Sequence, residues 1–221
     1  MKLRNRLYAC AGIGDNMNID FASLPTPTYV VDETLLRKNL ETLKYVSEQT
    51  GCRILLAQKA FSMYAAYPLI GEYLQGTTAS SLYEARLGRE EMKGEVHIFS
   101  PAYREDEIEE IISLCDHIVF NSFSQWKKYK ASISSSKGRI ECGIRINPEY
   151  SEIETDIYNP CYIGSRMGVT LSQFQPEDLE GIDGLHFHTM CEQNSDVLER
   201  TIKVVDEKFG SYIKRMKWIN F

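Results

Sequence analysis

Three features are missing from this sequence of 221 residues, and each absence argues against a class of protein. No apolar run approaches the roughly 18 residues that a membrane helix needs. No cluster of Lys and Arg is dense enough for a nucleic-acid interface, and the formal net charge is −6. The six cysteines show neither a CxxC motif nor another short regular spacing, so neither a zinc site nor a disulfide framework is expected. The sequence therefore predicts a cytoplasmic protein that binds neither membranes nor nucleic acids.

From residue 50 onwards, β-rich runs alternate with helical patterns. Such alternation predicts a parallel sheet, either doubly wound or closed into a barrel. A (β/α)8 barrel has eight strands and usually about 250 residues. We therefore expect a TIM-type barrel with about seven of its strands present and a chain truncated beyond Phe221. Strands are predicted at 53–59, 76–80, 96–100, 117–121, 142–147, 184–188 and 217–221, and helices at 63–74, 82–92, 105–115, 124–130 and 196–209.

The pattern divides the chain into three regions. Residues 1–16 are expected to be a disordered or spurious extension, because the patterned sequence begins only after them. Residues 17–50 should form a short N-terminal strand and a helix, and residues 51–221 the truncated barrel. Within the barrel, the long polar stretch 148–168 has no clear period, which is typical of a functional loop.

Lys59 lies at the end of the first predicted strand. In barrel enzymes the catalytic residues lie at this end of the strands. Partial desolvation there would lower the pKa of the amine and favour the neutral form, which attacks carbonyl carbons. Alternatively, the stem of Lys59 covers apolar surface while its amine stays in water. Position alone leaves both interpretations open.

His186 and His188 flank Phe187, so on a strand both imidazoles point to the same face. The pair could ligate a metal ion, although further ligands would then be needed. The other histidines, His97 and His117, lie within or at the start of predicted strands. Alternatively, one histidine stacks on an aromatic cofactor and the other is structural, or both belong to the core.

Arg145 lies inside a predicted strand between two isoleucines and should not be fully buried without a partner. It could bind a carboxylate or phosphate, or order its neighbours through hydrogen bonds. Cys191 and Glu192 follow the strand 184–188, at the same edge as Lys59. Either could equally be a loop side chain without a role.

Four acidic residues crowd the long loop, namely Glu149, Glu152, Glu154 and Asp156. Such a run is usually a solvated face. This one borders the predicted mouth of the barrel, where carboxylates would attract a polyamine.

Several segments resemble the fold-type III enzymes that depend on pyridoxal 5′-phosphate (PLP), the superfamily of alanine racemase and of ornithine and diaminopimelate decarboxylases. The likeness runs from about Asp20 to Phe221. Its last three segments are most similar to the carboxynorspermidine/carboxyspermidine decarboxylase branch. The segments are Leu24–Asp32 (LPTPTYVVD), Leu55–Phe61 (LLAQKAF), Gly76–Gly88 (GTTASSLYEARLG), Arg145–Glu152 (RINPEYSE), Asp156–Cys161 (DIYNPC) and Gly184–Glu192 (GLHFHTMCE).

The resemblance implies a role for four residues. Lys59 matches the lysine that holds PLP covalently, and His188 matches the histidine that stacks on its pyridine ring, whereas His186 does not. Arg145 matches the arginine on the barrel strand beneath the cofactor. Cys191 stands where relatives have a serine near the phosphate.

The resemblance also implies an activity, the PLP-dependent removal of CO2 from a carboxylated polyamine by an enzyme that is a homodimer at full length. Glu192, Glu154 and Asp156 are candidate substrate contacts, and no metal is expected. The family's C-terminal β domain is absent from the 221 residues, so this chain alone is expected to be inactive.

Three alternatives remain open on the sequence. The nearest is a decarboxylase of ornithine, arginine or diaminopimelate. A different class is a metal-dependent barrel hydrolase that uses His186 and His188. The third is a relative or fragment that has lost its chemistry.

Overall fold

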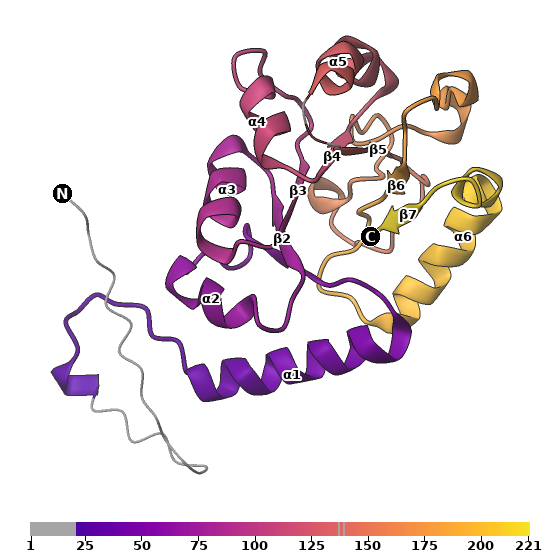
Figure 1. The fold of residues 1–221 in the computed structure, drawn as a ribbon. Helices are drawn as coiled ribbons and strands as arrows, with labels where there is room; N and C mark the ends of the chain where they lie inside the picture. Colours follow the sequence, from indigo (N-terminus) through magenta and orange to yellow (C-terminus); the bar gives the residue numbers. More distant parts are fainter. Residues whose placement is uncertain (1–20, 137, 139) are drawn as a thin grey trace.

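The computed structural model describes residues 21–136, 138 and 140–221, and at its centre lies a sheet of seven parallel strands (Figure 1). The expected α/β class is confirmed, and every strand begins and ends within two residues of its predicted bounds. The extension predicted for residues 1–16 lies outside the described residues. The strands are β1 Leu55–Ala57, β2 Gly76–Ala79, β3 Glu95–Phe99, β4 His117–Phe120, β5 Glu141–Arg145, β6 Gly184–His186 and β7 Trp218–Asn220.

The strands follow the order of the sequence, from β1 to β7, and each pairs in parallel with the next. Helices α2 to α5 follow one another around the outside of the strands, whereas α1 lies at one end of the molecule (Figure 1). The α-helices are α1 Glu33–Thr50, α2 Tyr67–Ile70, α3 Leu82–Leu87, α4 Ile108–Leu114, α5 Phe123–Ser135 and α6 Ser195–Ile213.

The helix predicted for 63–74 is broken into shorter pieces. A 3-10 turn at Tyr64–Ala66 precedes α2, which has only four residues. Pro68 lies in the first turn of α2, where an N–H group is not needed for a helical hydrogen bond. Gly71 directly follows the last residue of α2, where the helix ends. The predicted helix 82–92 is present as α3, continued by one π-helical turn.

The strand predicted within residues 17–50 is absent from the described part of that region. Phe21–Ser23 form a 3-10 turn, and the chain up to Asp32 joins no sheet. Pro25 and Pro27 lack the N–H groups that a strand ladder needs. The predicted helix is present as α1, which begins where the Asp32 carboxylate accepts hydrogen bonds from two backbone N–H groups of the first turn.

The main core lies between the sheet and the helices. Alternate residues of the central strands face the helices and are almost completely buried, as the period of two in a strand requires. These are Val96, Ile98, Ile118, Phe120, Cys142, Ile144 and Leu185. A smaller cluster joins α1 to α2 through Leu40, Tyr67 and Ile70. The opposite face of the same strands carries polar side chains, and the candidate site is built there.

No helix in the described ranges combines the length and the apolar composition that a membrane crossing requires.

Candidate active site

Lys59 lies two residues beyond the C-terminal end of β1, in a turn. The N–H groups of Ala60 and Phe61 close this turn with hydrogen bonds to the Ala57 carbonyl, at 3.0 and 3.1 Å. The Lys59 side chain is exposed, so the expected partial desolvation is wrong for this structure. The reason is that β1 is an edge strand of the sheet, and the neighbouring Ala57 is exposed as well.

Arg145, the last residue of β5, is only 3% exposed. Its guanidinium contacts a backbone carbonyl and an aromatic ring instead of an acid. Nη2 donates a hydrogen bond to the His188 carbonyl at 3.1 Å, and Cζ lies 4.8 Å from the ring centroid of Phe99. Nε is buried without a hydrogen-bond partner among the described residues. Burial lowers the pKa of Arg145 to about 10.

His186 and His188 present stacked rings, as their spacing predicts, with centroids 6.5 Å apart. His186 ends β6 and is buried, and this burial, with the charge of Arg145, lowers its pKa to about 3. His188 lies beyond the strand and is more exposed. Partial desolvation lowers the pKa of His188 too, as do the positive charges of Arg145 and Lys59. Lys59, Arg145 and His188 therefore share one electrostatic neighbourhood at the C-terminal edge of the sheet.

The other four predicted site residues are exposed. Cys191 has a free thiol, and Glu192 adopts a left-handed backbone conformation with φ of 54°. Glu154 and Asp156 lie on the long loop and have no ion-pair partner within the described ranges. In the same ranges, none of the four hydrogen-bonds to Lys59, Arg145 or His188.

The long loop after β5 is fastened to the segment after β6. The Ser151 hydroxyl donates to the Thr189 carbonyl at 2.7 Å, and the Gln193 amide donates to the Glu152 carbonyl at 2.9 Å. Arg200 of α6 holds the Glu152 carboxylate at 2.7 and 2.8 Å. Hydrogen bonds from Arg200 and from Tyr150 lower the pKa of Glu152 to about 2. Glu152 thus holds the loop in place, while Glu154 and Asp156 remain open to solvent.

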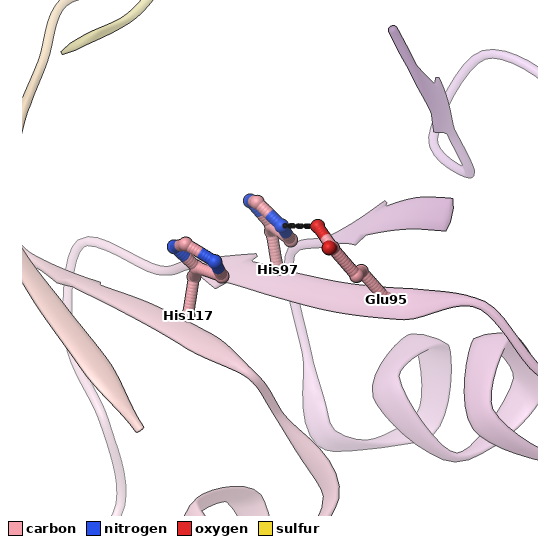
Figure 2. Close-up of side chains that lie close together, drawn as sticks. All are labelled: Glu95, His97 and His117. Atoms are coloured by element: carbon pink, nitrogen blue, oxygen red, sulfur yellow. Dashed lines mark hydrogen bonds and ion pairs between the residues drawn. The ribbon is translucent and has the colours of Figure 1, made fainter. Parts of the chain in front are cut away.

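Glu95, His97 and His117 form a cluster that the sequence did not reveal (Figure 2). His97 lies opposite His117 in the register of β3 and β4, and its Nε2 lies 3.1 Å from a carboxylate oxygen of Glu95. Burial lowers the pKa of His97 to about 4 and also lowers that of His117. The two neutral rings stack at 3.9 Å with 15° between their planes. Their in-plane lone pairs therefore lie in two nearly parallel planes, which disfavours convergence on one ion.

This cluster also lies at the wrong end of the sheet to cooperate with Lys59. Glu95 and His117 are the first residues of their strands, whereas Lys59 follows the end of its own. His186 and His188 belong to no group of three potential metal ligands in the described part of the chain. The geometry gives no support to a metal-dependent hydrolase built on that pair.

Comparisons with known proteins relate the chain to decarboxylases. No family model matches the chain. It is 45% identical over 201 residues to a carboxynorspermidine/carboxyspermidine decarboxylase of Campylobacter jejuni. The aligned region covers 91% of this chain and 52% of the relative. A carboxyaminopropylagmatine decarboxylase of Synechocystis is 39% identical over 203 residues, covering 92% of this chain and 52% of the relative. The chain is a homologue of these decarboxylases.

The solved structures support the same homology. The crystal structure of C. jejuni carboxynorspermidine decarboxylase complexed with norspermidine superposes with a TM-score of 0.80 at 43% identity, over 90% of this chain and 50% of that one. Diaminopimelate decarboxylase from Helicobacter pylori, at 20% identity and a TM-score of 0.68, shares the fold. The sheet is thus a half-barrel that shares the fold of these decarboxylases. This decarboxylase homologue spans about half the length of the relatives it matches.

Proposed function

We propose that this chain contributes the cofactor lysine and one wall of the active site to a PLP-dependent decarboxylase of carboxylated polyamines. One observation carries the proposal: Lys59 and the ring of His188 lie beside a buried arginine that has no acid partner in the described residues. An uncompensated buried charge is costly, so its retention indicates an anionic ligand.

The residues present fit PLP. Its phosphate and phenolate oxygens are anionic, and the charges of Lys59 and Arg145 favour anions. Arg145 Nε and His186 Nδ1 are both buried without hydrogen-bond partners in the described ranges, so the site retains unused polar atoms. The rings of His188 and Phe99 add aromatic surface for a planar ligand.

Three residues of this chain would have different roles in cofactor binding. Lys59 would supply the amine that holds the cofactor covalently. His188 would present its ring to the cofactor, and Arg145 holds the His188 backbone through its hydrogen bond to the carbonyl. When bound, PLP withdraws electrons from the substrate's α-carbon as CO2 leaves.

The substrate class follows from the relatives and from the exposed acids. The relatives are named for carboxynorspermidine, carboxyspermidine and carboxyaminopropylagmatine, and one is solved with norspermidine. All of these are polyamines. In this proposal Glu154, Asp156 and Glu192 attract the cationic amines, Cys191 lies near the phosphate, and the full-length enzyme acts as a homodimer.

Trapping with borohydride tests the proposal without requiring turnover. The chain is incubated with PLP, reduced, digested and analysed by mass spectrometry. The label is expected on Lys59 ahead of Lys38, an exposed lysine of α1, and Lys59→Ala should remove it while Lys38→Ala should not. Equal labelling of the two lysines would overturn the proposal.

A further inference from the structure

Gln58, the residue directly before Lys59, is only 1% exposed. Its side chain points into the helix layer, where Nε2 donates a hydrogen bond to the Glu84 carbonyl of α3 at 2.9 Å. Its Oε1 accepts a hydrogen bond from the Tyr67 hydroxyl at 3.2 Å. A leucine would fill such a position without the desolvation cost of an amide. The two hydrogen bonds therefore give Gln58 a function that packing alone does not explain.

Tyr67, the first residue of α2, is completely buried. Its hydroxyl lies 3.2 Å from Gln58 Oε1 and 3.4 Å from the Phe61 carbonyl, so it contacts the turn on both sides of Lys59. Burial raises the pKa of Tyr67 to about 12, so the hydroxyl keeps its proton and stays a donor at neutral pH.

The Glu84 carbonyl, which accepts the hydrogen bond from Gln58, belongs to a helix turn that is itself held by hydrogen bonds. Ser81 caps α3 by accepting a hydrogen bond from the Glu84 N–H, and the Glu84 carboxylate accepts one from the Ser80 N–H. These two hydrogen bonds, which resemble a capping box shifted by one residue, hold the first turn of α3. Gly88 lets the helix approach closely, because a Cβ there would lie 2.2 Å from Thr77 Oγ1 and 3.2 Å from Gln58 Nε2. Gln58 is thus anchored to a rigid surface.

We infer that Gln58 and Tyr67 are positioning residues for Lys59: by tying both sides of the turn to α2 and α3, they direct the exposed lysine toward His188 and Arg145. The catalytic part of this inference rests on the proposed function, because it requires Lys59 to be the cofactor lysine. As a statement about the turn, it stands on the hydrogen bonds alone.

The first test measures the turn without any cofactor. Gln58→Met keeps the approximate volume and removes both hydrogen bonds, and Tyr67→Phe removes only the hydroxyl. Amide hydrogen exchange of Ala60 and Phe61 is expected to speed up roughly three- to tenfold in both variants, the effect of about one net hydrogen bond. The matched control is Tyr64→Phe, because Tyr64 makes no side-chain hydrogen bond in the described residues. Exchange at the wild-type rate in both variants would overturn the inference.

The second test measures the direction of the amine. Lys59 condenses with an aldehyde, forming a carbon–nitrogen double bond and releasing one water, and borohydride then donates hydride to that bond. Labelling of Lys59 by PLP should slow roughly three- to tenfold in Gln58→Met. Labelling by glyoxylate, a small aldehyde that does not need the surrounding wall, should change by less than about twofold.

The two tests separate the inference from the proposed function. Suppose that PLP does not label Lys59 of the wild-type chain, but amide exchange is faster in the variants. The PLP role would then be rejected and the positioning role kept. Preferential labelling of Lys59 that is unaffected by Gln58→Met would keep the PLP role and reject the positioning role. If PLP and glyoxylate label Lys59 of the variant equally slowly, the amine has become less accessible to any aldehyde. That result would also contradict the positioning role.

Discussion

Arg145 and the backbone of His188 are joined by one hydrogen bond of 3.1 Å, from Nη2 to the carbonyl oxygen. His188 lies two residues beyond the end of β6, where sheet pairing no longer fixes the chain. The buried guanidinium of the neighbouring strand therefore holds the residue that carries the candidate ring-stacking histidine.

Replacing Arg145 with methionine should separate stability from cofactor binding. Removal of a buried charge without an acid partner should leave the free energy of unfolding unchanged or raise it by about 1 kcal/mol. Retention of PLP should weaken by about tenfold, as expected for the loss of a charged contact. Urea denaturation and a PLP titration measure the two quantities.

Arg89 provides the matched control for this substitution. It pairs with Asp116 at 2.7 Å and donates to the Leu114 carbonyl. Arg89→Met should therefore lower the free energy of unfolding by about 1 kcal/mol or more. An Arg145→Met protein that is destabilised as strongly as Arg89→Met would show that Arg145 is a structural residue.

His186 and His188 should respond differently to alanine. His188 is the more exposed ring beside Lys59, so His188→Ala should weaken retention of PLP with little change in melting temperature. His186 is buried against Arg145 and Phe99, so His186→Ala should mainly lower the melting temperature. Comparable losses of PLP in both variants would contradict this division.

Acid should destabilise the fold through its histidines. All four have lowered pKa values, with His97 at about 4 and His186 at about 3. The unfolded chain takes up protons below the ordinary histidine pKa of about 6.5, whereas in the folded chain His97 is protonated only near 4 and His186 only near 3. The free energy of unfolding should therefore fall as the pH drops from about 6.5 to about 4. Urea denaturation across this range measures the fall.

His97→Gln isolates one part of that pH dependence. The variant keeps a hydrogen-bonding side chain beside Glu95 but no longer titrates. Its free energy of unfolding should fall less steeply between pH 6.5 and 4, by roughly 2–3 kcal/mol in total relative to wild type. Identical slopes for the two proteins would refute the assignment of a neutral, buried His97.

The indole of Trp218 occupies the space above Gly184. A Cβ on Gly184 would lie 2.0 Å from Trp218 Cδ2. Gly184→Ala should therefore lower the free energy of unfolding by about 1–3 kcal/mol through overpacking. Gly138→Ala is the control, because a Cβ there meets no atom within 4 Å. Equal melting temperatures for the two variants would contradict the close contact.

The sequence predicted the order of the elements because local patterns determine it. β-Rich runs mark the strands, and the apolar stripe marks α6. The predicted helix 63–74 was wrong because Pro68 and Gly71 outweigh a favourable apolar pattern. The exposure of Lys59 was missed because the expected desolvation was argued from a closed barrel, whereas β1 is an edge strand of the sheet.

Local patterns predicted the candidate site only where residues lie close in sequence, and the resemblance alone connected Lys59, Arg145 and His188. His186 and His188 share a face because they are two residues apart, and the structure agrees. His97 meets His117 only through the register of β3 and β4, which neither segment encodes alone. The anchor of Gln58 depends on where α2 and α3 pack, so its position before Lys59 gave no signal.

The order of the strands has a consequence for synthesis on the ribosome. Each of the seven strands in the described residues pairs only with its neighbours in sequence, so none of these pairings waits for a segment made much later. Chains emerge at about 5–20 residues per second, and pairing of nearby segments is faster. We expect β1, β2 and β3 to associate while β6 is still being translated, so that the sheet grows vectorially from β1 and, in a stalled chain, the strand made last still lacks its next partner.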